Sequence, residues 1–231
     1  MIRTTAAALL ACALVMTPAC TRTSAGVPSS GDEQAAQTPT SQQAPQKAPQ
    51  KTRGPAADDP MPGIEPTPAQ VDTPCVPDVV PPVRAVATVA DPGAPTVTVG
   101  VPDGWSTAPG DGDPEGLRLQ GPDGMDAVVT IEATSLDAEA AFRGWIDFLT
   151  EDATVSTVSA LPGQLCGYSG QELLGNLADD SQSVQYRDRL VYFSATAQAY
   201  LVVVHVEAPA DTPGFDEAST LLTDDFEIAP V

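Results

Sequence analysis

The sequence changes character at Cys75, and this change limits how much of the chain can form a compact domain. Residues 21–74 are rich in Pro, Gln, Ala, Ser and Thr, and their large apolar residues are only Val27, Met61, Ile64 and Val71. Such a segment cannot bury enough apolar surface to offset the chain entropy lost on folding. We therefore predict a disordered tether over 20–74 and a single domain over 75–231, a length typical of one domain.

The first residues have the pattern of a secretory signal. Arg3 gives a charged start, residues 4–15 carry no charge, and the small residue Ala19 precedes Cys20. This order of charged, apolar and small residues is typical of a signal peptide. The apolar run is shorter than the ~20 residues of a transmembrane helix, so we predict a cleaved signal over 1–19.

Cys20 is predicted to be the first residue of the mature protein and to carry a lipid. A cysteine that follows a small residue at the end of an apolar run resembles a bacterial lipobox, whose cysteine is acylated before cleavage. The alternatives are acylation of Cys12, which would leave a signal of only eleven residues, ordinary cleavage after Ala19, or an uncleaved anchor. Lipidation at Cys20 would place the domain on the extracytoplasmic face of the cell membrane.

The remaining cysteines are Cys75 and Cys166, because Cys12 leaves with the signal and Cys20 carries the lipid. Outside the cytoplasm, two remaining thiols usually form a disulfide. We therefore predict a Cys75–Cys166 bridge, with two buried, unpaired thiols as the alternative.

The periodicity of the domain predicts an α+β fold, an antiparallel sheet covered by two helices. The clearest element is a helix over 136–150, whose apolar residues recur at helical spacing and whose N-cap is expected at Thr134 or Ser135. A second helix is expected near 212–222, with Thr212 as its cap and Pro213 at its first position. Strands are expected at 96–101, 116–120, 127–133, 153–159, 168–174, 183–196 and 199–207, with a last short strand near 224–230.

The order of these features resembles that of the LpqN/LpqT-type lipoproteins of mycobacteria and their relatives. The resemblance covers about 90–230 and is carried by "VTVGVPDGW", an acidic turn, a hairpin, "AEAAFRGWIDFL", and a closing strand pair followed by a helix. It implies a domain similar to the photosystem protein PsbP, an α/β/α sandwich. It also implies an envelope lipoprotein without an established enzymatic activity, linked to binding and to the handling of cell-wall lipids.

The charge and the motifs of the domain argue against several classes of function. From Cys75 onward there are 25 Asp and Glu against five Arg and no Lys, a net charge of −20, which would repel nucleic acid. His205 is the single histidine and no catalytic partner is visible by motif, so we expect a structural role for it and no enzymatic activity. The "DGDPEG" turn at 111–116 resembles the start of a calcium loop, but Pro122 occupies the position of its bidentate Glu, so we expect no metal and no cofactor.

Aromatic residues are the candidates for a ligand pocket. Trp105, Phe142, Trp145 and Phe148 are expected either in the core or around an acyl chain held between the helix and the sheet. Two functions follow. The first is a membrane-anchored accessory module that binds an unknown envelope protein. The alternative is a carrier of a cell-wall lipid or glycolipid.

Overall fold

A computed structural model of the chain describes residues 61–66, 74–224 and 226–231. The predicted signal over 1–19, and with it Cys12 and Cys20, lies outside the described residues. The rest is an α+β fold built on a seven-stranded antiparallel sheet in the order β3-β4-β5-β9-β8-β7-β6. Its strands are β3 (Ser106–Pro109), β4 (Glu115–Gln120), β5 (Asp126–Thr134), β6 (Val155–Pro162), β7 (Ser169–Ala178), β8 (Ser183–Ser194) and β9 (Ala199–Pro209).

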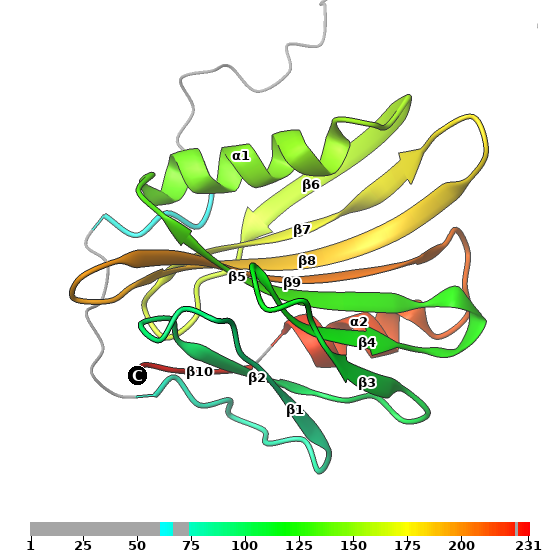
Figure 1. The fold of residues 1–231 in the computed structure, drawn as a ribbon. Helices are drawn as coiled ribbons and strands as arrows, with labels where there is room; N and C mark the ends of the chain where they lie inside the picture. Colours follow the sequence, from blue (N-terminus) through cyan, green and yellow to red (C-terminus); the bar gives the residue numbers. More distant parts are fainter. Residues whose placement is uncertain (1–60, 67–73, 225) are drawn as a thin grey trace, which may run out of the picture. The chain divides into compact units, whose positions relative to one another are not determined.

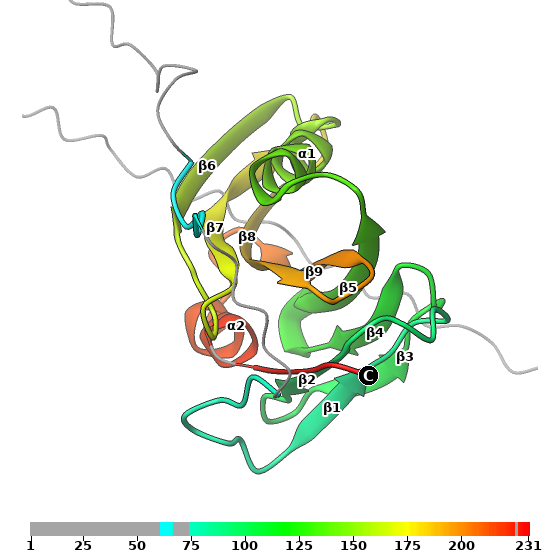
Figure 2. The same cartoon turned by 90° about the vertical axis from the view of Figure 1, so that its left-hand side faces the viewer.

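A second, three-stranded sheet lies against one face of the large sheet (Figures 1 and 2). It consists of β1 (Arg84–Ala87), β2 (Thr96–Gly100) and β10 (Glu227–Ala229) in the order β1-β2-β10. Helix α2 (Phe215–Thr223) contacts β9, β8 and β2 on this same face. Helix α1 (Ala138–Thr150) covers β7 and β8 on the opposite face (Figure 2). The prediction of a single sheet between two helices is therefore incomplete, because a small second sheet shares one face with α2.

The domain has two hydrophobic cores, one on each face of the large sheet, and alternate side chains of β9 point into one or the other. Tyr200, Val202, Val204 and Val206 belong to the core shared with the small sheet, whereas Leu201 and Val203 belong to the core beneath α1. Both sets are buried, because β9 lies in the middle of the large sheet. A strand covered on both faces carries a nearly continuous apolar run, as residues 200–204 do.

Both helices exist as predicted, but their N-termini differ from the prediction. Asp137 is the N-cap of α1, and its side chain accepts a hydrogen bond from the Ala140 N–H at 2.8 Å. Thr134 instead ends β5, where its side chain accepts a bond from the Leu136 N–H. The N-cap of α2 is Gly214, in the left-handed conformation, so Thr212 and Pro213 precede the helix.

The predicted tether is corrected at residues 61–66, which pack on the domain. The carbonyl of Gly63 accepts a hydrogen bond from the Gly170 N–H, and the carbonyl of Pro62 accepts one from the Gln171 side chain. Met61 and Ile64 pack against the core beneath α1. These were two of the few large apolar residues in the segment, and their burial explains why this short stretch joins the domain.

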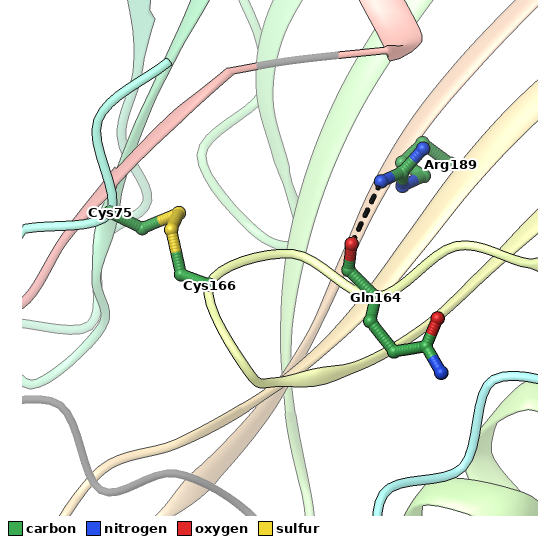
Figure 3. Close-up of a disulfide and its surroundings, with 4 residues drawn as sticks. All are labelled: Cys75, Gln164, Cys166 and Arg189. Carbon is green, nitrogen blue, oxygen red and sulfur yellow. Dashed lines mark hydrogen bonds between the residues drawn. A yellow bond between two sulfur atoms is a disulfide. The ribbon is translucent and has the colours of Figure 1, made fainter. Parts of the chain in front are cut away.

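The structure contains the predicted bridge between Cys75 and Cys166 (Figure 3). The two Cα atoms are 5.7 Å apart. Cys75 forms an isolated bridge with Ile228, and Cys166 lies in the turn between β6 and β7, where Arg189 donates a hydrogen bond to the Gln164 carbonyl. The disulfide therefore joins the entry of the domain to the turn that precedes β7, and the first residues of β7 form the hydrogen bonds to residues 61–66.

Candidate ligand-binding groove

A groove of about 680 Å³ lies beside helix α1, where the helix leaves part of the large sheet uncovered. Helix α1 contacts β7 and β8, whereas β5 lies two strands further along the sheet. The even-numbered residues of β5 face α1, because Ala127, Val129 and Ile131 point into the core on the other side. The uncovered even-numbered residues of β5, together with Leu201 and His205 of β9 beside them, thus form the floor of the groove, and α1 forms one wall.

The lining is mainly apolar. It consists of Pro114, Val128, Thr130, Glu132, Thr134, Leu136, Ala141, Gly144, Trp145, Phe148, Leu201 and His205. Two of the apolar members remain largely open to solvent: the side chain of Phe148 is 66% exposed and that of Leu136 is 51% exposed. The volume falls within the ~300–1,000 Å³ that is usual for small-molecule sites, which are typically lined by apolar and aromatic side chains.

Gly144 gives the helical wall its shape. It lies in the middle of α1, where glycine costs about 1 kcal/mol relative to alanine. A Cβ added at Gly144 would meet no atom within 4 Å, so the packing of the fold does not require glycine there. The missing side chain leaves space on the wall of the groove.

Two of the four aromatic residues predicted for a pocket line the groove. Trp145 and Phe148 are in contact with each other, with ring centroids 5.5 Å apart. Phe142 is fully buried in the core beneath α1 and supports the helix from below. Trp105 packs against the other core, on the opposite face of the large sheet, and its ring lies over Gly121. Neither Trp105 nor Phe142 therefore lines this groove, and the four aromatic residues do not form one pocket.

A buried polar network fixes Trp145 on the helical wall of the groove. The indole N–H of Trp145 donates to Asp188 Oδ2 at 2.7 Å, and His205 Nδ1 lies 2.6 Å from Asp188 Oδ1. His205 Nε2 lies 3.4 Å from Glu207 Oε2. Asp188 is fully buried on β8, and these two side chains occupy both of its carboxylate oxygens.

The two carboxylates hold His205 in its charged form. Burial opposes the charge, but the Asp188 carboxylate, with help from Glu207, raises the pKa of His205 to about 10. The hydrogen bond to His205 in turn lowers the pKa of Glu207. A histidine that stays protonated at neutral pH is not a general base. The network therefore acts as an ionic support that holds the Trp145 side chain in place. No sequence motif indicated Asp188, because its partners lie 43 and 17 residues away.

The acidic turn at 111–116 contributes one residue, Pro114, to the lining of the groove. The turn at 111–116 connects β3 to β4, and Glu115 forms an ion pair with Arg118. The carbonyl of Pro114 also accepts a hydrogen bond from the Ile131 N–H of β5. Within the described residues, no helix combines the length and the hydropathy that crossing a membrane requires.

Comparison with known proteins identifies a similar fold. No protein-family model and no curated protein sequence matches the chain. The crystal structure of LpqN from Mycobacterium tuberculosis, described as involved in cell envelope biogenesis, superimposes with a TM-score of 0.51. The alignment covers 64% of this chain and 91% of LpqN at 17% sequence identity. The domain thus has a distant LpqN-like fold.

Proposed function

We propose that the chain is a non-catalytic lipoprotein of the cell envelope whose domain carries a lipid by binding its acyl chain in the groove beside α1. The observation that supports this proposal is the groove itself, a mainly apolar space that the fold leaves open between helix and sheet. Of the two functions considered from the sequence, the groove favours the lipid carrier over a module that binds only proteins.

The chemistry of the lining suits a hydrocarbon chain. Trp145, Phe148, Leu136 and Val128 offer apolar surface, and burying each methylene group of a ligand there would contribute about 0.8 kcal/mol. The ionisable lining residues are Glu132 and His205, and His205 already has two carboxylate partners. A lipid with an uncharged head group, such as a glycolipid, would therefore meet less electrostatic opposition than an anionic phospholipid.

The proposed location in the cell envelope rests on the predicted lipid at Cys20 and on the fold. An acylated Cys20 would hold the domain near the outer face of the cell membrane, where lipids are the abundant ligand. The similar structure, LpqN, is described as involved in envelope biogenesis, which is consistent with this location. We also propose that the fold belongs to the PsbP-like class, as the resemblance in sequence implies.

The test is lipid mass spectrometry of the full chain purified from its native host. We expect a lipid in near-stoichiometric amount with the wild-type protein. Gly144→Leu should abolish it, because Gly144 lines the groove and an added Cβ there meets no atom within 4 Å, so the leucine side chain would occupy the groove. Leucine is also a better helix former than glycine, so the variant should keep the stability of α1.

Asp147→Leu is the matched control. It places the same side chain on the same helix, but Asp147 is exposed and does not belong to the groove lining. The control should retain the lipid. Equal lipid content in Gly144→Leu and Asp147→Leu, or a wild-type protein without any lipid, would contradict the carrier function. The accessory module that binds a protein would then be the better explanation.

A further inference from the structure

Strand β6 forms one outer edge of the large sheet. In the described part of the chain it pairs with β7 alone (Figure 2). The pairing runs from Val155 opposite Ala178 to Pro162 opposite Gln171. The Gly163 N–H donates to the Gly170 carbonyl at 2.9 Å, just beyond the end of the strand. Because hydrogen bonding alternates along an antiparallel strand, the N–H groups of Ser156, Val158 and Ala160 point away from β7.

The surface of β6 is unusual for a domain with a net charge of −20. Residues 153–171 contain no Asp, Glu, Lys, Arg or His. Three apolar side chains of the strand are exposed: Val155 at 63%, Val158 at 36% and Leu161 at 47%. Exposed edge strands are normally protected by charged side chains, prolines or bulges. Pro162 provides such protection at one end of β6, but the seven residues before it lack any.

The spacing of these residues makes the edge complementary to itself. We infer that β6 pairs with β6 of a second copy of the chain, antiparallel and related by a two-fold axis at Val158. In that register Val155 lies opposite Leu161 of the other copy, twice, and Thr157 lies opposite Ser159. Each exposed apolar residue thus meets an apolar partner, and cross-strand pairs of this kind stabilise a sheet.

The charges at the ends of β6 fit the same arrangement. Glu151 and Asp152 precede the strand, and the register places Asp152 opposite Gln164 of the second copy, in an uncharged stretch. A parallel arrangement would instead bring the two acidic ends together. The remaining carboxylates lie outside the paired strands, and at physiological salt, charges more than ~8 Å apart are largely screened.

Cysteine cross-linking of the full-length chain in membranes tests this pairing. Directly opposed residues of a hydrogen-bonded pair have Cα atoms about 5.5 Å apart, within the range of a disulfide. Val158→Cys should therefore give, on mild oxidation, a reducible band at twice the mass of the monomer. Val155→Cys alone should not, because the register separates the two copies of residue 155 by six residues, roughly 20 Å.

A second pair of variants keeps the test decisive if Val158→Cys folds poorly. Chains carrying Val155→Cys and chains carrying Leu161→Cys should cross-link with each other when they are produced together. Val79→Cys is the control for random collision, since Val79 is 78% exposed and lies far from β6 in the sequence. Cross-linking of Val158→Cys no stronger than that of Val79→Cys, together with no mixed Val155–Leu161 product, would overturn the inference.

Discussion

Replacing His205 by glutamine removes the charged member of the network beneath the groove and should change how stability depends on pH. In the folded protein the two neighbouring carboxylates raise the pKa of His205 from 6.5 to about 10. The side chain is 16% exposed, so solvent screens this interaction only weakly. One pKa unit corresponds to about 1.4 kcal/mol, and the raised pKa therefore contributes about 4–5 kcal/mol to the free energy of unfolding where it acts in full.

The sign of the effect follows from the direction of the shift. The contribution of His205 is complete below the pKa of the unfolded state, near 6.5, and is lost as the pH rises toward the folded value of about 10. Between these two values the wild-type free energy of unfolding should fall by about 1.4 kcal/mol per pH unit. Glu207 affects stability at the acidic end of the pH range. Its pKa is lowered in the folded protein, so its contribution is present above the unfolded pKa of 4.5 and is lost as the pH falls below that value. Stability should therefore be highest between about pH 5 and 6.5.

Urea denaturation followed by circular dichroism measures this effect. The wild-type chain and His205→Gln are compared at about pH 6.5, 8 and 9.5, and the difference between the two free energies should shrink as the pH rises. At the lowest of these values the variant should be less stable by about 3–5 kcal/mol, as for a broken buried ion pair. Two parallel curves, with a constant difference across this range, would refute the charged state of His205.

Three further predictions follow from the packing of the domain. Replacing Cys75 and Cys166 together by alanine should lower the free energy of unfolding by about 2–5 kcal/mol, measured by urea denaturation, because the bridge closes a loop of 91 residues; an unchanged midpoint would contradict this. Gly63→Ala should release residues 61–66 from the domain and expose them to limited proteolysis, because the added Cβ would overlap the Gly170 carbonyl oxygen. Gly112→Ala is the control, with a similar positive φ but open space around it, and should leave the cleavage pattern unchanged. Asp137→Ala should cost about 0.5–2 kcal/mol in the same denaturation assay, since it removes the N-cap of α1.

The elements with a strong period could be predicted from the sequence. The alternation in β5 and the helical spacing in α1 each reflect a single buried face. The nearly continuous apolar run in β9 reflects a strand that is buried on both faces. Strands β1 and β3 could not be predicted, because each is four residues long and all of β3 is exposed, so neither carries a clear alternation. The packing of residues 61–66 could not be predicted either, since it depends on hydrogen bonds to the start of β7, more than 100 residues away in the sequence.

The groove could be predicted only in part, for a similar reason. The aromatic residues of α1 indicated Trp145 and Phe148 because both recur at the helical spacing of its apolar residues. Trp105 was misplaced because sequence spacing does not tell on which face of the sheet a distant side chain lies. Asp188 gave no signal at all, since an acidic residue within a strand becomes meaningful only when the fold brings Trp145 and His205 to it.

The two tryptophans provide the most direct test of lipid binding in the groove. Trp145 lines the groove, whereas Trp105 packs on the other face of the sheet. We would add a lipid with a brominated acyl chain to Trp105→Phe, which keeps Trp145, and to Trp145→Phe, which keeps Trp105. Saturable fluorescence quenching of Trp145 alone, abolished by Gly144→Leu, is the predicted result. Equal quenching of both tryptophans, or none of either, would contradict a lipid bound beside α1.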